Sequence, residues 1–322
     1  MNTLYPTRLR NLVFPCVLAG FVCFSALSAH ATLIAYDTFT TDPGGYTVDT
    51  NIFGQSSTIE TYGFTGVWGG TNSNFFTSRT LGMQKDGVIT SSGVVRLSTS
   101  SGLSRSDNRG FNALAGQSTL WFGSYMRVDA NALTPSNGAE LMFGFTSGGV
   151  PLGSTDSATG ALWSTSNGGS LSGFQWGVSS SNSLVVKYQS GSNTVDTVDS
   201  GFVLSSAYPT TYFLVAQLLV NESGNDTLNV WVLTSTPVDE SAILSITPTL
   251  TVSSADILSN SSELDTLLLN SGATGSTSSL SFDDTHIGTT YADLTSIPEP
   301  AEAAGLAGAL AVLAVFLARR RR

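Results

Sequence analysis

The sequence predicts an all-β protein, built as a two-sheet β-sandwich of the jelly-roll kind. Short runs of apolar residues, many alternating with polar ones, recur along the chain, and turn-forming Gly, Ser and Asn separate these runs about every 10 to 15 residues. No convincing helical periodicity interrupts this pattern between Thr32 and Ile297. Charged residues make up only 11% of the chain, and Ser, Thr, Gly and Asn dominate the polar set, which is typical of extracellular β-proteins.

Individual strands follow from these runs. Residues 119–128 alternate clearly, which predicts a strand with two different faces. Residues 212–220 are apolar at nearly every position, as in a strand buried on both faces, and the turn formers of residues 221–226 predict a hairpin with residues 228–232. The other expected strands are residues 33–39, 87–90 and 94–97 (a second hairpin around Ser-Ser-Gly), 141–145, 174–178, 184–188, 264–269 and 280–287. Residues 148–173 and 238–260 have the weakest strand pattern, and the first of these segments predicts a long loop.

The composition of the body limits its chemistry and its partners. Both cysteines, Cys16 and Cys23, fall in the first 31 residues, so the body has neither a disulfide nor a reactive thiolate. Six of the 13 basic residues and two of the 23 acidic residues lie in the terminal segments, which leaves the body with 7 minus 21, or −14, formal charges. Such a charge argues against a nucleic acid as partner.

The N-terminal residues 1–31 have the three parts of a secretory signal peptide. Two arginines provide a positive start, the apolar residues 12–27 follow, and Ala29 and Ala31 form a small-x-small cleavage pattern. We therefore expect export through the Sec translocon and cleavage after Ala31. An uncleaved anchor is the alternative, but the apolar core is shorter than the about 20 residues that span a bilayer.

A second address lies in residues 295–322. The tripeptide Pro298-Glu299-Pro300 precedes an uninterrupted apolar segment, residues 303–318, which predicts a transmembrane helix about 24 Å long. By the positive-inside rule, the basic cluster that follows is expected in the cytoplasm and the body outside the inner membrane. A plain C-terminal membrane anchor is the alternative. The cluster consists of Arg319, Arg320, Arg321 and Arg322.

This arrangement resembles the PEP-CTERM sorting tail of proteins that are handled by exosortase, a membrane transpeptidase-like enzyme of Gram-negative bacteria. The resemblance covers the tail alone. It implies an exosortase-type enzyme as partner, a transient inner-membrane anchor, and processing near Pro298-Glu299-Pro300. The final location that it implies is the cell envelope, the cell surface or an exopolysaccharide matrix.

Three stretches of the body are distinctive, namely Ala35–Phe39, the hairpin Thr211–Val232, and Phe282–Leu294. With them, residues 32–294 resemble the concanavalin A-like lectin and glucanase sandwiches in their laminin-G-like form. In that fold the first and last strands are neighbours, which implies that Asp37 lies near Asp283 and Asp284. The chain departs from the family pattern at Thr285-His286, where an apolar residue and an arginine are more usual.

Catalytic residues are not expected in this body. Glucanases of the resembling fold place Glu-x-Asp-x-x-Glu on one strand, and the nearest match begins with Glu263 and Asp265 but has Leu268 in place of the third acid. His286 is the one histidine after the signal peptide, so a zinc site lacks ligands. A hydrolase triad is not expected either, because no serine lies in a Gly-x-Ser-x-Gly turn before a helix. We expect a protein that is not an enzyme, with a divergent glycoside hydrolase as the alternative.

Calcium is the one metal that suits this composition, because it takes several oxygen ligands. The candidate ligands are Asp37, Asp283 and Asp284. An acidic surface without a metal is the alternative, and no other cofactor is expected.

Carbohydrate is the expected ligand class. Sugar rings stack on aromatic side chains, and Trp68, Trp163 and Trp176 lie in Gly-, Ser- and Asn-rich surroundings that favour exposure. Core packing is the competing interpretation for each of them, and it is preferred for Trp121 and Trp231, which fall within strand patterns. The sequence thus predicts an exported surface or matrix protein that binds polysaccharide without cleaving it.

Overall fold

The chain divides into two units, Met1–Ala31 and Thr32–Arg322. The computed structural model describes residues of the second unit only, with gaps between the described ranges. These ranges are residues 33–70, 76–80, 83–85, 88–89, 92–98, 105–112, 116–130, 141–146, 173–179, 182–191, 194–205, 210–254, 257, 264–271 and 279–295.

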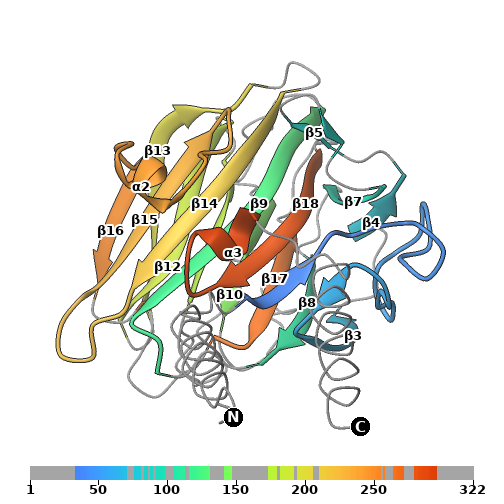
Figure 1. Ribbon diagram of the computed structural model, residues 1–322, viewed down its shortest axis with the longest axis horizontal. Helices are drawn as coiled ribbons and strands as arrows, with labels where there is room; N and C mark the ends of the chain where they lie inside the picture. Colours follow the sequence, from blue (N-terminus) through green and yellow to red (C-terminus); the bar gives the residue numbers. More distant parts are fainter. Residues whose placement is uncertain are drawn as a thin grey trace, which may run out of the picture. The chain divides into compact units, whose positions relative to one another are not determined.

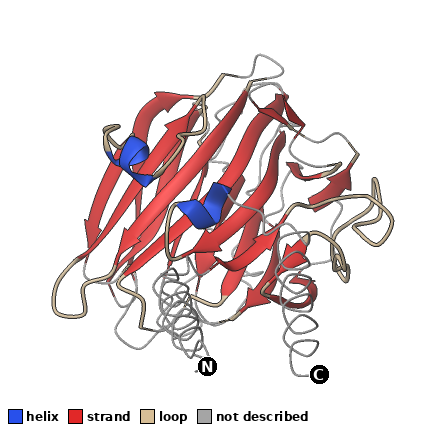
Figure 2. Ribbon diagram, in the orientation of Figure 1, coloured by secondary structure: helices blue, strands red, loops and turns tan. Residues whose placement is uncertain are grey.

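Antiparallel strands form nearly all of the regular secondary structure in the described residues (Figure 1, Figure 2). A nine-stranded sheet has the order β16 (Leu250–Ser254), β15 (Asp226–Leu233), β14 (Thr211–Leu219), β9 (Thr119–Ala130), β18 (Ser279–Gly288), β1 (Leu33–Asp37) and β2 (Thr61–Tyr62), with β7 (Val94–Ser98) paired to β18 and β4 (Phe76–Arg79) paired to β7. A seven-stranded sheet has the order β13 (Thr194–Val203), β12 (Ser183–Gly191), β11 (Gly173–Val178), β10 (Leu141–Thr146), β17 (Thr266–Ser271), β8 (Arg105–Phe111) and β3 (Phe64–Gly70). A third, two-stranded sheet joins β5 (Gln84–Lys85) to β6 (Val88–Ile89).

The two large sheets pack face to face through aromatic side chains, which confirms the predicted all-β sandwich. Phe122 of β9 lies 4.5 Å, centroid to centroid, from Phe145 of β10 in the opposite sheet. Phe143 of β10 lies at the same distance from Phe282 of β18. All four rings are fully buried, so the centre of the core is built from one face of each strand.

Most of the predicted strands are confirmed. In β9 the side chains of Leu120 and Phe122 face the core, while Trp121 belongs to a second cluster on the opposite face of the strand. The hairpin around residues 221–226 is confirmed by the pairing of β14 with β15. The first and last strands, β1 and β18, are antiparallel neighbours, as the resemblance implied.

The predicted hairpin between residues 87–90 and 94–97 is wrong. β6 pairs with β5, whereas β7 pairs with β4 and with β18. The physical reason is burial, because Val95 and Leu97 of β7 enter the main core, where they oppose Phe282 and Leu280 of β18. Packing in the larger sheet outweighs the local turn signal.

Two short helices, α2 (Glu240–Leu244) and α3 (Ala292–Thr295), lie on the outer face of the nine-stranded sheet (Figure 1), and the sequence interpretation missed both. The Asp239 carboxylate caps α2 by accepting a hydrogen bond from the Ala242 amide at 2.8 Å. Within the ranges given above, no helix has the length and apolar character that crossing a membrane requires. The predicted transmembrane segment, residues 303–318, lies outside the described residues.

Beneath these helices the outer face carries its own apolar cluster. Trp121 and Trp231 stack with ring centroids 6.0 Å apart, and Tyr291 packs edge-on against Trp121. Ile243 of α2 and Leu294 of α3 complete the cluster. The expectation that both tryptophans serve packing is therefore confirmed.

We expect Phe143→Ala to lower the free energy of unfolding by about 3–5 kcal/mol, because it leaves a cavity at the contact between the two sheets. Urea unfolding followed by tryptophan fluorescence measures this change. Phe53→Ala is the matched control, since Phe53 is 37% exposed and its loss should cost under about 1 kcal/mol. Equal costs for the two variants would contradict the assigned core.

Candidate functional site

Most of the sequence-predicted site residues lie outside the described part of the chain and stay predictions. Of the carboxylates in the glucanase-like motif, Asp265 is described, and its Oδ1 accepts a hydrogen bond from Thr266 Oγ1 at 2.8 Å. The residues not described are Ala29, Ala31, Trp163, Glu263, Pro298, Glu299, Pro300, Arg319, Arg320, Arg321 and Arg322.

The structure removes Trp68 and Trp176 as stacking candidates. Both side chains are 0% exposed and belong to the main core, so neither indole offers a face to a sugar ring. The small residues around them serve close strand packing instead of exposure. At Gly177, for example, a Cβ would lie 1.9 Å from the Leu141 carbonyl oxygen.

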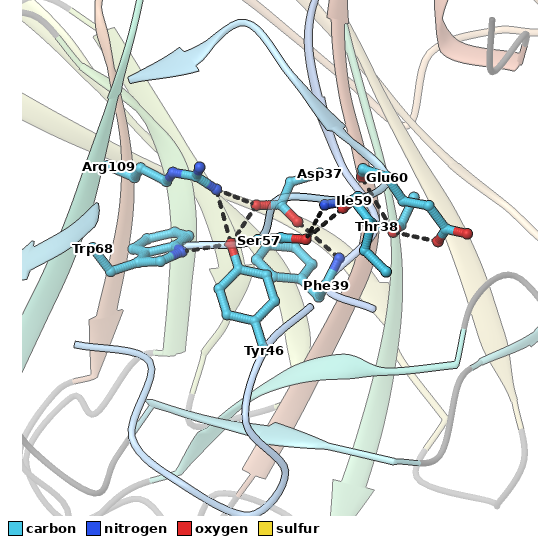
Figure 3. Close-up of polar contacts among 9 residues, drawn as sticks. All are labelled: Asp37, Thr38, Phe39, Tyr46, Ser57, Ile59, Glu60, Trp68 and Arg109. Atoms are coloured by element: carbon cyan, nitrogen blue, oxygen red, sulfur yellow. Dashed lines mark hydrogen bonds and ion pairs between the residues drawn. The ribbon is translucent and has the colours of Figure 1, made fainter. Parts of the chain in front are cut away.

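A buried polar cluster connects the two large sheets (Figure 3). Asp37 at the end of β1 forms an ion pair with Arg109 of β8, with 2.6 Å between Oδ2 and Nη1. The Tyr46 hydroxyl donates to the same carboxylate oxygen at 2.5 Å, and it accepts hydrogen bonds from Arg109 at 2.8 Å and from Trp68 Nε1 at 3.0 Å. The Phe39 amide donates to the other carboxylate oxygen at 2.9 Å.

This cluster is structural, because no part of it is open to a substrate. Asp37, Tyr46 and Arg109 are 0%, 2% and 3% exposed. Burial raises the pKa of Asp37, and the Arg109 guanidinium together with the hydrogen bonds from Tyr46 and Phe39 opposes that rise. Burial and the Asp37 carboxylate raise the pKa of Tyr46 well above its usual range, so its hydroxyl keeps the proton that it donates.

The three predicted calcium ligands lie close together but do not form a metal site. Asp37 opposes Thr285 across the β1–β18 pairing, next to Asp284. Burial raises the pKa of Asp284 well above its usual range, and the carboxylates of Asp283, Glu60 and Asp37 add to this effect. Among the described residues no group of three His, Cys, Asp or Glu side chains could hold a metal ion, and Asp37 is already paired with a cation.

His286 also has a structural place. Its ring is 3% exposed, Nδ1 lies 3.2 Å from the Asp293 carbonyl oxygen, and the ring stacks on Tyr36 with 5.7 Å between centroids. Burial lowers the pKa of His286 to about 4, against a weaker opposite effect of the Asp293 carbonyl. The imidazole is therefore uncharged at neutral pH, and it joins the end of β18 to α3.

The sequence interpretation missed an aromatic row on the outer face of the nine-stranded sheet. Tyr36 of β1 stands between Tyr62 of β2 and His286 of β18 in the strand register. The Tyr36 and Tyr62 rings stack with 6.4 Å between centroids, and Tyr62 is 56% exposed. Alternation along the opening strand already implies that Tyr36 and Asp37 face opposite ways, but the pairing with Tyr62 has no local signal.

No protein-family model and no curated protein matches the chain. Among solved structures, an endo-β-1,4-glucuronan lyase from the fungus Trichoderma reesei matches with a TM-score of 0.48 and 12% identity over 82% of this chain and 98% of that chain. An alginate lyase from Chlorella virus matches with a TM-score of 0.42 and 9% identity over 67% of this chain and 93% of that chain.

A botulinum neurotoxin type C chain, whose cell entry depends on two ganglioside molecules, matches with a TM-score of 0.36 and 11% identity. The match covers 67% of this chain and 43% of the toxin chain, so this protein spans less than half the length of that one. At such TM-scores and identities these neighbours carry no argument about function. The class of the protein, an antiparallel β-sandwich, therefore rests on its own strand pairings.

We expect Arg109→Met to destabilise the fold by about 3–5 kcal/mol, because the Asp37 carboxylate would stay buried without its cation. Adding Asp37→Asn removes that charge, so the double variant should recover part of the loss. Urea unfolding of the wild type, both single variants and the double variant measures the coupling. A double variant no more stable than Arg109→Met would contradict the inter-sheet ion pair.

We expect the free energy of unfolding of the wild type to depend on pH through His286. The contribution of its buried, uncharged ring is fully present above pH 6.5. The unfolded chain binds a proton near pH 6.5 and the folded chain only near pH 4, so this contribution falls as the pH drops through that window, by up to about 3 kcal/mol. Asp37 and Asp284 have raised pKa values in the folded state, so their contributions to the free energy of unfolding grow as the pH falls, opposite to that of His286.

The comparison of wild type with His286→Gln isolates the histidine, because both chains share those aspartates. Urea unfolding at several pH values between 4 and 7 should give curves whose difference shrinks toward low pH. Parallel curves would contradict a buried, neutral imidazole.

Proposed function

We propose that this protein is an exported, non-catalytic component of the cell surface or of an exopolysaccharide matrix, delivered there by its C-terminal segment. The observation that carries the proposal is the order of features at the end of the body. Pro298-Glu299-Pro300, the apolar residues 303–318 and the arginines 319–322 come soon after α3, the last described helix, which ends at Thr295. Export by the Sec translocon and sorting by an exosortase-type enzyme are parts of this proposal.

The packing of α3 supports a division of the chain into a folded body and a C-terminal sorting segment. Leu294 is 4% exposed and Tyr291 is fully buried, and both contribute to the apolar cluster on the outer face. Tyr291 Oη also donates to the Pro237 carbonyl oxygen at 3.0 Å, which ties the start of α3 to the segment before α2. The body is thus held by tertiary contacts up to Leu294, four residues before Pro298. Four residues of extended chain reach at most about 14 Å.

Support for a non-catalytic body comes from the position of acidic and basic groups whose pKa values are shifted. Asp37, Asp284 and His286 are each at least 94% buried, and their neighbours are other parts of the same fold. Perturbed groups that serve catalysis lie at a surface cleft where a substrate reaches them. Asp37 and His286 instead make contacts within the fold, since Asp37 pairs with Arg109 and the His286 ring stacks on Tyr36.

Polysaccharide is the partner that suits this location and this body. The acidic body, with its −14 formal charges, is unsuited to nucleic acids and to anionic membranes, whereas an uncharged sugar polymer meets no repulsion there. Sugar recognition relies on aromatic faces and on hydrogen-bonding groups in place of net charge.

We expect the mature protein from a Gram-negative host with an exosortase to begin at Thr32 and to lack the apolar segment 303–318. Intact-mass spectrometry of the surface fraction reads both ends at once. Glu299→Gln should leave the tail uncut and the protein in the inner membrane, and Glu302→Gln, an acid just outside the tripeptide, is the matched control. Recovery of the full-length wild type from the cytosol would overturn the proposal.

A further inference from the structure

Tyr36 and Tyr62 form an open aromatic surface at one end of the nine-stranded sheet. Their ring planes lie within 19° of parallel, with 6.4 Å between centroids. Tyr62 is 56% exposed and Tyr36 is half-buried. β2 is the last strand on this side of the sheet in the described residues, so the pair reaches the sheet edge.

The backbone on both sides of Tyr62 adopts unusual conformations. Gly63 has φ 74°, and a Cβ there would lie 1.9 Å from the Ile34 carbonyl oxygen, so only glycine allows β2 to approach β1 this closely. Glu60 also has a positive φ, 49°, which costs about 1–3 kcal/mol in a residue other than glycine. The surrounding structure must offset this cost, and the pairing of Tyr62 with Tyr36 and of Thr61 with Asp37 holds the two-residue strand beside β1.

Elsewhere on the same face of the sheet the aromatic side chains are buried. Trp121 and Trp231 are at most 2% exposed, and they pack in one cluster with Ile243 of α2 and Leu294 of α3. The chain therefore covers one aromatic group on this face and leaves another open. A partly exposed aromatic pair at a strand edge suits contact with a ligand.

A sugar ring has the shape and chemistry that this surface can accept. The C–H face of a pyranose packs on an aromatic ring, while the hydroxyls at its rim hydrogen-bond to neighbouring polar groups. The exposed Glu60 supplies such a group, and its Oε2 already accepts a hydrogen bond from Thr38 Oγ1 at 3.0 Å. Burial, with added effects of the Glu60 and Asp37 carboxylates, raises the pKa of Tyr36, so its hydroxyl stays protonated.

The charges around the pair select against acidic sugars. The Glu60 carboxylate lies close enough to Tyr36 to raise its pKa, and the body as a whole is strongly acidic. Arg109, the cation that the structure places nearby, is buried and engaged by Asp37 on the inner side of the sheet. The carboxylates of a uronate polymer would therefore be repelled by this surface, and the buried Arg109 could not bind them.

We propose that Tyr36, Tyr62 and Glu60 form a binding subsite for a neutral glycan, with Tyr62 as the stacking platform. The proposal deepens the polysaccharide part of the proposed function and rests on it. It replaces the buried tryptophans as the place of contact.

Affinity electrophoresis of the full chain in mild detergent tests the subsite. The gels contain laminarin or hydroxyethylcellulose as neutral glucans, or alginate as an acidic polymer. We expect the neutral glucans to retard the wild type and alginate to leave it unretarded. Tyr62→Ala should weaken the binding by roughly five- to tenfold, whereas Tyr62→Phe, which keeps the ring, should stay within about twofold.

Val203→Ala is the matched control, because Val203 is an apolar residue 66% exposed on β13 of the other sheet. Its binding should equal that of the wild type, and all variants should unfold at the same urea concentration. Retardation unchanged in Tyr62→Ala would overturn the subsite while leaving polysaccharide binding in place. Retardation by none of the polymers would overturn both, whereas the sorting proposal is decided separately by the mass of the mature chain. Retardation by alginate alone would overturn the selection for neutral sugars.

Discussion

The pairing of the first strand with the last strand is the constraint on which the rest of this structure depends. β1 and β18 come from opposite ends of the body, so their contact must offset the entropy of closing a very long loop. Alternation along β1 then divides its side chains between two tasks. Asp37 points into the sandwich and pairs with Arg109 of the opposite sheet, while Tyr36 points outward between Tyr62 and His286. A slip of one residue would exchange these faces.

A bulge in β18 sets this register. Phe282 and Ile287 both face the core although they are five residues apart, an odd separation that regular alternation does not allow. The pairing of β18 with β9 is irregular between Asp283 and His286, and Asp284 within that stretch has φ 45°. The extra residue reverses the alternation and turns His286 toward the outer face. Asp284 lies within this bulge, and burial raises the pKa of its carboxyl well above the usual range.

Local patterns predicted those parts of the fold that depend on local contacts. The alternation of residues 119–128 and the hairpin of residues 212–232 could be recognised from the sequence, because each strand pairs with a neighbour or faces one continuous core. The pairing of residues 94–97 could not, since their partner in β18 lies about 185 residues further along the chain. The resemblance to lectin-like sandwiches supplied the long-range pairing of β1 with β18 that periodicity could not.

The candidate site was less predictable than the fold, for a related reason. Glycine and serine beside Trp68 and Trp176 suggested exposed loops, but in this sandwich small residues also occur where strands approach closely. The Tyr36–Tyr62 pair depends on a two-residue strand whose place is fixed by Gly63 and by the register with β1. Neither feature has a signal in residues 58–63 alone. Exposure is a property of the assembled sheet, so the sequence could suggest aromatic stacking without identifying the residues.

The outer face of the nine-stranded sheet carries both the open tyrosine pair and the covered cluster beneath α2 and α3. His286 stands at the border between its open and covered parts, because its ring stacks on Tyr36 while Nδ1 faces the Asp293 carbonyl of α3. The same helix packs Leu294 over Gly123, where a Cβ would lie 3.2 Å from a Leu294 methyl carbon. The last described residues of the chain, in α3, therefore lie on the face that carries the tyrosines. The seven-stranded sheet lies across the main core from this face, so it is on the far side of the sandwich from both the tyrosine pair and α3.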